Sequence, residues 1–249
     1  MKVRKLEFHS TFKIKKVMIE LKGIYKWVNT GNNRTFLLKD INLTVKQGEF
    51  ISIMGPSGSG KSTLLNVIGM LDEFDEGEYI FMNEPVHKLK EKQRAALYKQ
   101  YIGFVFQAYH LIDELTVYEN IETPLIYQDI KSSERKAMVA DILDRFNIVG
   151  KKDLFPTQLS GGQQQLVGIA RALIANPKLL LADEPTGNLD PETTDEIMQL
   201  LTSICKDYGA ALIMATHDYN VIYKFPARII KTEKGHVYDS ARHVAGAQG

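Results

Sequence analysis

FISIMGPSGSGKST, residues 50–63, is the stretch that decides the fold of this chain. Residues 50–54 are an apolar run of the kind that forms a buried strand. Residues 55–62 match the pattern GxxxxGK[ST], and a helical pattern begins at Lys61 and continues to about Met70. A strand, a glycine-rich turn and a helix in this order build a loop whose backbone N–H groups point inward at phosphate. The stretch therefore predicts an α/β protein with a phosphate-binding loop.

The residue types in this loop predict a nucleoside triphosphate as the ligand. Gly55, Gly58 and Gly60 allow the backbone to curl around the phosphates. Lys61 would neutralise the β- and γ-phosphates, and the hydroxyl of Ser62 would ligate Mg²⁺. A chance match to four fixed positions is the alternative, and the flanking strand and helix argue against it.

A second apolar run ends in two carboxylates. Residues 179–182 are Leu-Leu-Leu-Ala, typical of a buried strand, and Asp183 and Glu184 follow. Asp183 at the end of the strand can hold Mg²⁺ through water, and Glu184 can orient or deprotonate an attacking water. Alone the pair would be interpreted as an exposed acidic turn. Beside a phosphate loop it predicts a hydrolytic site.

Two more polar residues follow predicted strands. Gln107 comes after the apolar run 101–106, and His217 comes after the buried strand 210–215. In a parallel α/β sheet such positions face the ligand crevice. Most glutamines are surface residues and most lone histidines are structural. An amide at Gln107 can nevertheless reach the metal or water, and His217 at the end of its strand would face the ligand crevice.

The stretch LSGGQQQLVGIARAL, residues 159–173, has the features of a second anion site. Ser160 can cap the helix, the two glycines allow a close approach of the backbone, and the helix dipole favours a negative charge. One chain with one phosphate loop has no evident use for a second such site.

The remaining pattern predicts strands alternating with helices, and hence a largely parallel sheet. Residues 108–170 differ, because a capping box at 116–119 and a helical stripe indicate a mostly helical insert, in which one helix ends near Gly150. The other expected elements are strands near 18–27, 41–45, a hairpin arm at 76–83, and a helix that begins at Asp190-Pro191 and places Ile197, Leu200, Leu201 and Ile204 on one face.

Composition and charge exclude several classes. The 249 residues are 44% hydrophobic and 24% charged, as in ordinary soluble globular proteins, and the net charge of +1 gives no indication of a nucleic-acid partner. Residues 1–16 carry a net charge of +5 and the remainder −4. Residues 1–17 are therefore interpreted as a basic tail, or as an upstream start in place of Met18. A tail that touches anionic lipid is the alternative.

Targeting features are scarce. The single cysteine, Cys205, excludes an internal disulfide and suits a reducing compartment. No apolar run approaches the roughly 20 residues that span a bilayer, and the basic N-terminus lacks the apolar core of a signal peptide. The expectation is a cytoplasmic chain that does not itself cross a membrane.

Together these motifs resemble the nucleotide-binding subunit of ABC transporters. The resemblance runs from about Met18 to Tyr238, and LSGGQ is its most specific part. The residues of these motifs are most similar to those of the macrolide-efflux, lipoprotein-release and cell-division group of bacterial ATPases. The matching segments are GPSGSGKST (55–63), FQ (106–107), LSGGQQQ (159–165), LLLADEPT (179–186), NLD (188–190) and THD (216–218).

The resemblance implies a phosphate-loop ATPase fold with a mostly parallel core sheet, an antiparallel β subdomain and a helical subdomain. It implies one ABC ATPase domain over residues 18–240, with the catalytic core and β subdomain at 18–107 and 171–240. Residues 108–170 would be the helical signature subdomain and 241–249 a C-terminal tail.

The resemblance also implies roles for single residues, with ATP and Mg²⁺ as ligands. Glu184 would be the general base, His217 would contact the γ-phosphate, and Gln107 would sense the metal and couple to a membrane partner. Lys61 would act on the phosphates, and Ser62, Gln107 and Asp183 would hold the metal. The implied ATP-binding residues are Gly55, Pro56, Ser57, Gly58, Ser59, Gly60, Lys61, Ser62 and Thr63 of one chain, with Ser160, Gly161, Gly162 and Gln163 reaching the ATP of a second copy and Asp190 communicating across the dimer.

The sequence departs from the family pattern at the expected adenine site. The family places an aromatic residue where this chain has Val28, with Trp27 and Tyr25 beside it. Either Trp27 substitutes as the stacking residue, or base stacking is weak.

Two further departures fall in the signature helix. Leu166 stands where the family usually has a basic residue, and with Ile169, Ala170 and Leu173 it forms a stripe expected to pack rather than touch nucleotide. Gly168 lies in mid-helix at a cost of about 1 kcal/mol relative to alanine, and it would permit a close helix contact.

The leading functional hypothesis is an ATPase that dimerises on ATP and drives a separate integral membrane permease from the inner face of the membrane. A second hypothesis is a regulatory ATPase that controls a cell-wall or cell-division process through a membrane partner. A third is a soluble ABC-type ATPase of DNA repair or translation, but this chain has neither the long coiled-coil insertion nor the tandem cassettes of those classes. The transported substrate belongs to the partner and is not encoded in these motifs.

Overall fold

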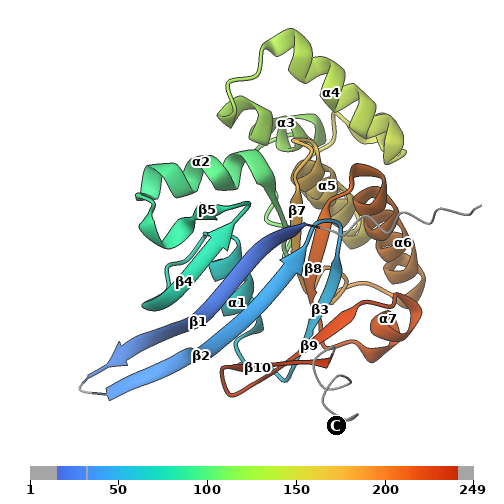
Figure 1. Ribbon diagram of the computed structural model, residues 1–249. Coiled ribbons are helices and arrows are strands. Elements are labelled where there is room, and N and C mark those ends of the chain that lie inside the picture. Colours follow the sequence, from blue (N-terminus) through green and yellow to red (C-terminus); the bar gives the residue numbers. More distant parts are fainter. Residues whose placement is uncertain (1–15, 32, 241–249) are drawn as a thin grey trace, which may run out of the picture.

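The computed structural model describes residues 16–31 and 33–240 of the chain (Figure 1). Most of the basic segment predicted as a tail, residues 1–15, lies outside the described residues, as does the predicted C-terminal tail at 241–249.

The described strands form two sheets. One has four strands in the order β2-β1-β4-β5, all antiparallel, and the other has six in the order β10-β9-β3-β8-β7-β6. In the second sheet only the edge pair of β10 and β9 is antiparallel. The strands are β1 (Val17–Thr30), β2 (Asn33–Lys46), β3 (Phe50–Met54), β4 (Glu76–Phe81), β5 (Glu84–Pro85), β6 (Ile102–Val105), β7 (Leu179–Asp183), β8 (Ala211–Ala215), β9 (Arg228–Glu233) and β10 (His236–Asp239).

Helices connect and cover these strands. The α-helices are α1 (Lys61–Ile68), α2 (Glu91–Tyr101), α3 (Val117–Tyr127), α4 (Ser132–Arg145), α5 (Gly161–Leu173), α6 (Pro191–Tyr208) and α7 (Tyr219–Lys224), with short 3₁₀ turns at Val86–Lys88, Val149–Lys151 and Pro156–Gln158. Helices α3 and α4 lie at one end of the molecule, and the long β1–β2 hairpin projects from the other (Figure 1).

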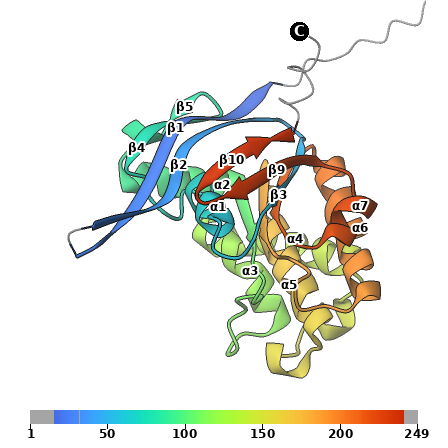
Figure 2. The same ribbon diagram turned by 90° about the horizontal axis from the view of Figure 1, so that it is seen from below.

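The parallel sheet is buried on both faces, which explains its uninterrupted apolar strands. Side chains alternate between the two faces, so Leu179 and Leu181 of β7 pack into one core while Leu180 and Ala182 pack into the other. The first core holds α1 between the two sheets, as Figure 2 shows. The second core joins the opposite face to α3, α4, α5 and α6. This arrangement brings the carboxyl ends of β3, β7 and β8 to one edge of the sheet.

The predicted fold class is confirmed: a mostly parallel α/β core, an antiparallel β sheet and a helical portion are all present. The predicted helix caps at Thr116 and Asp190 are confirmed as well. The Thr116 side chain accepts from the backbone N–H of Glu119, and Asp190 accepts from the N–H of Thr193 with Pro191 at the first helical position.

Three boundaries differ from the sequence prediction. Helix α1 ends at Ile68 rather than near Met70, because Met70 has a left-handed backbone with φ +58°. Helix α4 ends at Arg145, and Asn147, with φ +54°, takes the left-handed position that Gly150 was expected to take. Asparagine tolerates this conformation better than most residues, so it can end a helix as glycine does. The arm predicted at 76–83 is strand β4 only as far as Phe81.

Helix α2 was not predicted, and its C-terminal residue Tyr101 was assigned to a strand that begins one residue later. None of its residues is fully buried, so the helix carries no clear apolar stripe that periodicity could detect. Among the described residues, no helix is both long and apolar enough to cross a membrane.

Candidate nucleotide site

The phosphate loop joins β3 to α1 at the carboxyl edge of the parallel sheet. Gly60, the residue before α1, has φ +105°, a backbone conformation that side chains with a Cβ rarely adopt. Ser59 is buried beneath the loop, where its hydroxyl lies 2.7 Å from that of Thr232 on β9. Thr232 in turn donates to the carbonyl of Met54. The loop is therefore tied from below to its neighbouring strand, and its upper side is open.

A cavity of about 950 Å³ lies above the loop. It brings together most of the residues that the sequence singled out, although they are spread over about 160 positions of the chain. Its lining includes Pro56, Ser57, Gly58, Gly60, Lys61, Ser62, Thr63, Gln107, Asp183, Glu184 and His217, together with Thr35, Phe36, Leu37, Lys39, Lys234 and Gly235. Gly55 and Ser59 lie at the base of the loop and do not line the cavity.

The cation at the first turn of α1 is held in place by the loop itself. Lys61 Nζ donates to the carbonyls of Gly55 at 2.8 Å and Pro56 at 3.2 Å, and it lies 3.9 Å from Glu184 Oε1. The side chain is only 9% exposed. A positive charge with little freedom next to the N-terminus of a helix is suited to bind phosphate.

Asp183 ends strand β7 beside Ser62. Burial raises the pKa of its carboxyl group, while a hydrogen bond from Ser62 and the charge of Lys61 lower it. One carboxylate oxygen, Oδ1, is buried and has no hydrogen-bond partner among the described residues. A desolvated carboxylate oxygen beside a serine hydroxyl suits Mg²⁺, which prefers oxygen ligands and retains several waters. The residues present therefore fit that ion.

Glu184 follows with a strained backbone. Its φ is +46°, in the left-handed region that costs most residues energy, and a proline comes next. Its side chain is 12% exposed, and Oε1 lies 2.8 Å from Nδ1 of His217. The contact joins the ends of β7 and β8, since Glu184 N–H also donates to the carbonyl of Ala215. A carboxylate held between a lysine and a histidine at the cavity wall is placed to accept a proton from water.

Gln107 is exposed at the end of β6, and the turn that follows it is strained and clamped. Tyr109 and His110 both have a positive φ, of +59° and +48°. The guanidinium of Arg171, near the end of α5, donates to both of their carbonyls. The turn after Gln107 is therefore held by α5, the helix that also carries the LSGGQ motif.

The LSGGQ motif lies outside the cavity. Ser160 caps α5 by accepting from the N–H of Gln163, and the Gln163 side chain accepts from the N–H of Ser160. The two glycines pack closely against neighbouring side chains, since a Cβ on Gly161 would lie 2.9 Å from the Tyr109 hydroxyl and one on Gly162 would lie 2.7 Å from a Thr193 methyl, so a larger residue would displace these side chains. None of residues 160–163 lines the cavity.

Asp190 also lies apart from the cavity and acts within its own chain as the cap of α6. Its carboxylate accepts from the backbone N–H groups of Glu192 and Thr193 and from the Thr193 hydroxyl. The hydrogen bonds from Thr193 lower the pKa of Asp190. Its predicted role across a dimer stays a prediction.

The aromatic residue that lines the cavity is Phe36 on β2. Trp27, which the sequence named as the substitute for adenine stacking, does not line the cavity. The guanidinium of Arg34 lies 4.7 Å from the centre of the Trp27 ring, and Phe36 meets the same ring edge-to-face at 5.5 Å. Phe36 is 38% exposed. The placement supports Phe36 rather than Trp27 as the stacking residue.

The two departures in α5 have different outcomes. Leu166 is half-buried and packs against the second core, as its stripe predicted. Gly168 does lie beside the turn after Gln107, but a Cβ there would be 3.5 Å from the Tyr109 carbonyl oxygen, an ordinary contact. The close approach expected at Gly168 therefore does not require a glycine.

Comparison with known proteins supplies the family. Residues 38–187 match the family described as "ABC transporter". The chain belongs to this family. As an ABC cassette it binds ATP and hydrolyses it, which agrees with the loop, carboxylates and histidine gathered in the cavity.

Curated relatives agree with the assignment. The uncharacterised ABC transporter ATP-binding protein MJ0796 of Methanocaldococcus jannaschii is 46% identical over 226 residues, which are 88% of this chain and 95% of the relative. MJ1508 of the same organism is 40% identical over 222 residues, 89% of this chain and 98% of the relative. The macrolide export ATP-binding/permease protein MacB of a Shewanella species is 40% identical, but the cassette spans only 34% of it.

Solved structures extend the agreement to three dimensions. A dimeric post-hydrolysis structure of the MJ0796 cassette bound to ADP and Pi superposes with a TM-score of 0.82 at 42% identity, covering 90% of this chain and 98% of that one. A second dimeric structure of MJ0796 gives a TM-score of 0.81 at 44% identity, covering 88% of this chain and 96% of the other.

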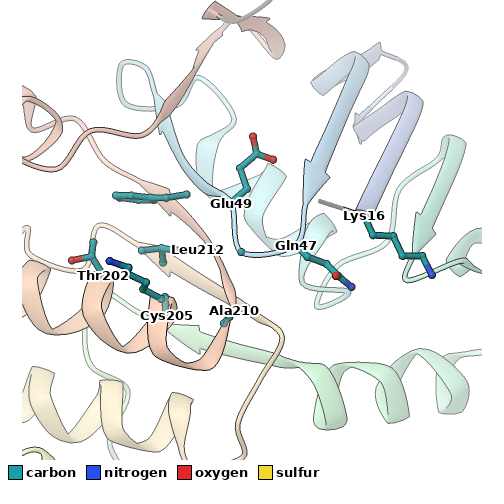
Figure 3. Close-up of a pocket in the computed structure, with 11 residues that line it drawn as sticks. Lys16, Gln47, Glu49, Thr202, Cys205, Ala210 and Leu212 are labelled. Carbon is teal, nitrogen blue, oxygen red and sulfur yellow. The ribbon is translucent and has the colours of Figure 1, made fainter. Parts of the chain in front are cut away.

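A separate groove of about 550 Å³ lies at the opposite end of the parallel sheet, where β3 and β8 begin (Figure 3). Lys16, Gln47 and Glu49 lie on one side of it, and Cys205 and Leu212 on the other. The carboxylate of Glu49 is already engaged, since it pairs with Arg228 and accepts from the N–H of Lys46. None of its lining residues is shared with the cavity above the phosphate loop.

Sequence reasoning assigned no role to three residues that the structure places at the cavity or against the loops beside it: Phe36, Gln165 and Arg171. Phe36 has no motif around it, and only the β1–β2 pairing brings it to the cavity. Gln165 and Arg171 lie within the quoted signature stretch, but periodicity could not say which neighbouring loops they meet. A signal was present for Gln165, because an amide on the buried side of an apolar helix must find a partner.

Proposed function

We propose that this chain is the ATP-hydrolysing subunit of an ABC transporter and that two copies close around two ATP molecules to drive a membrane permease. The observation that carries the proposal is the separation of the two anion sites. The phosphate loop, Asp183, Glu184 and His217 share one cavity, while the capped N-terminus of α5 lies outside it and is exposed at Ser160. A helix N-terminus built for an anion is explained if a second copy brings the phosphate to it.

The dimeric structures of MJ0796 support this arrangement. In a head-to-tail dimer each ATP would contact the phosphate loop of one chain and residues Ser160–Gln163 of the other. ATP then holds the dimer closed because both surfaces share its phosphates, and hydrolysis releases it. Asp190, at the start of α6, would lie on the same interface.

The roles within one chain follow from the geometry of the cavity. Glu184 accepts a proton from the attacking water, and His217, 2.8 Å away, orients the carboxylate and contacts the γ-phosphate. Lys61 binds the phosphates and offsets the charge that moves onto the leaving group. Ser62, Asp183 and Gln107 are the residues we assign to Mg²⁺, which when bound neutralises negative charge on the β- and γ-phosphates.

The adenine base is assigned to Phe36. Its ring lines the cavity and is supported at the edge by Trp27, so one ring is free to stack while the other holds it in place. Val28, at the position where the family pattern expects an aromatic residue, is 44% exposed and does not line the cavity.

The membrane partner would contact the helical portion. An apolar groove of about 360 Å³ runs between α2, β6, α3 and α5, close to the turn after Gln107. Ile126 and Tyr127 at the end of α3 are 49% and 65% exposed, and exposed apolar side chains beside a groove are typical of an interface. Such a partner places the cassette on the cytoplasmic face of the membrane. The macrolide exporter MacB among the relatives favours transport over a purely regulatory role.

Two substitutions test the proposal on the full-length chain. Glu184→Gln keeps the size of the side chain but removes the base, so we expect ATP to bind normally, the dimer to persist, and turnover to fall about 10²- to 10⁴-fold. Ser160→Arg fills the exposed helix start, so the single chain should bind ATP normally but fail to dimerise. Light scattering and phosphate release measure both.

Each assignment can be contradicted separately. A Glu184→Gln variant that hydrolyses at the wild-type rate would contradict the base assignment. A Ser160→Arg variant that loses ATP binding and dimerisation together would contradict the shared site. Purification from membranes under native conditions with no membrane protein attached would contradict the permease partner.

A further inference from the structure

Gln165 lies on the second turn of α5 and is fully buried. Its side-chain amide Nε2 donates to the backbone carbonyl of Pro185, and its Oε1 has no hydrogen-bond partner among the described residues. Burying a polar amide with one of its groups unpaired is unfavourable, and nonpolar side chains of the same size are available. The one hydrogen bond it makes is therefore the feature that needs an explanation.

The carbonyl that Gln165 binds belongs to the residue directly after Glu184. Glu184 has φ +46° and is followed by a proline, a combination that the backbone does not adopt without support. The turn is held on the other side by two backbone hydrogen bonds, from Glu184 N–H to the carbonyl of Ala215 and from Gly187 N–H to the carbonyl of Glu184. Gln165 supplies a side-chain restraint from a different helix at Pro185, and so acts on the direction in which the Glu184 carboxylate points.

The same helix begins at Ser160. Gln165 lies five positions after Ser160, a rise of about 7.5 Å along the helix axis. A helix of 13 residues moves as a unit, so a shift of its capped N-terminus is passed to Gln165 and then to Pro185. In the proposed dimer the two ends serve different nucleotides, because Ser160 faces the ATP of the partner and Glu184 acts on the ATP of its own chain.

We infer that Gln165 is a positioning residue that couples the two ATP sites of the dimer. When the LSGGQ motif closes on the partner's ATP, α5 shifts the Pro185 carbonyl and orients Glu184 to take a proton from the water that attacks the chain's own ATP. Hydrolysis in one site then depends on occupation of the other. The inference rests on the proposed function, specifically on Glu184 as base and Ser160 at the shared site.

The test compares Gln165→Met with Gln164→Met in the full-length chain. Methionine has nearly the volume of glutamine and removes the amide donor. Gln164 is the matched control, since it is half-buried and, among the described residues, its side chain donates only to the Leu159 carbonyl, five positions back in its own chain. A thermal melt and ATP binding by the single chain establish that each variant folds.

For Gln165→Met we expect kcat to fall about 10- to 100-fold, the effect of a displaced catalytic group, with KM for ATP nearly unchanged. The Hill coefficient for ATP should fall below the wild-type value but stay above 1, because ATP-driven dimerisation still requires two nucleotides. When Gln165→Met is combined with Glu184→Gln, the ATP-held dimer should form at the same ATP concentration as with Glu184→Gln alone, since Ser160 is intact. Gln164→Met should behave as wild type in every assay.

A second variant, Gln165→Glu, gives a rescue. A buried carboxyl group has a raised pKa, and in its protonated form its O–H can donate to Pro185 as the amide did. Its kcat relative to wild type at the same pH should therefore recover as the pH falls from about 8 to about 6. The ratio for Gln165→Met should not change with pH.

The inference is overturned if Gln165→Met keeps its kcat and Hill coefficient, or if Gln164→Met loses as much. It is also overturned if the ratio for Gln165→Glu does not change with pH. If Glu184→Gln hydrolyses normally, or if Ser160→Arg loses ATP binding and dimerisation together, the proposed function itself fails. If Glu184→Gln and Ser160→Arg show the effects expected of them while Gln165→Met is unaffected, only the coupling inference fails.

Discussion

The chain contains two helix N-termini suited to an anion, those of α1 and α5, and their surroundings differ. Helix α1 begins after Gly60 with no side-chain cap, so its first N–H groups are left for a ligand inside a cavity that also holds Lys61. Helix α5 is capped by the side chain of Ser160 and begins at an exposed surface. The first site has its cation and its cavity within one chain, whereas residues 160–163 do not line that cavity. Two helix starts of the same kind therefore lie in different surroundings, and in the proposed dimer the second would face the nucleotide of the other copy.

The surroundings of the two helix starts also differ in the backbone strain and charge burial that they contain. Around α1 the structure holds a desolvated Asp183, a left-handed Glu184 and a lysine that is 9% exposed. Around α5 the motif itself is a regular capped helix, with glycines where Tyr109 and Thr193 come close. A left-handed backbone and an unfavourably buried charge therefore lie side by side at the end of β7, as expected for a site held by the rest of the fold.

The largest expected effect comes from Asp183→Asn, which removes the buried charge from the first site. We expect ATPase activity to be lost, because the assigned metal oxygen is replaced by an amide. The chain without nucleotide should become more stable to heat, because a charge that the fold buries unfavourably is gone. Calorimetry and phosphate release on the same samples measure both.

The pH dependence of stability gives the control for Asp183. Burial raises its pKa in the folded state above the ordinary 3.8, so its contribution to stability is present below that value and is lost as the pH rises through the folded pKa. The stability gain of Asp183→Asn should therefore grow over this window and be absent below it. A gain that does not vary with pH would contradict the role of the buried charge.

A smaller effect is expected at the first site when stacking on the adenine base is removed. Phe36→Ala should raise the Kd of ATP about tenfold, since stacking on an aromatic ring contributes about 1–3 kcal/mol per base. The Kd of inorganic triphosphate, which lacks a base, should not change. Isothermal titration with both ligands measures this, and Val28→Ala is the matched control because that side chain does not line the cavity. An equal loss for triphosphate would show that Phe36 acts on the loop rather than on the base.

The smallest effect lies on the signature helix. Gly168→Ala should stabilise the chain by up to about 1 kcal/mol, because alanine is the better helix former and its Cβ finds an ordinary contact, 3.5 Å from Tyr109 O. Denaturant unfolding measures it. Destabilisation would show that α5 approaches the turn after Gln107 more closely than this geometry indicates.

The sequence predicted the fold class and the cavity well, because both rest on short-range patterns. A strand that leads into GxxxxGK[ST] and a helix, or an apolar run that ends in two carboxylates, has one common structural outcome. The residues of these motifs were therefore placed correctly at the edge of the sheet. Helix α2 was missed because none of its residues is fully buried, and the end of α4 was misplaced because Asn147 rather than a glycine takes the left-handed position.

What the sequence by itself determined is the chemistry of each segment: which loop binds phosphate, which strand ends carry acids, and which helix is capped by serine. The tertiary structure alone decided which segments meet. It brought Phe36 rather than Trp27 to the cavity through strand pairing, and it placed Gln165 against the carbonyl that follows Glu184. The physical reason is that capping and periodicity act over a few neighbouring residues, whereas a hydrogen bond between residues 20 positions apart depends on how whole elements pack.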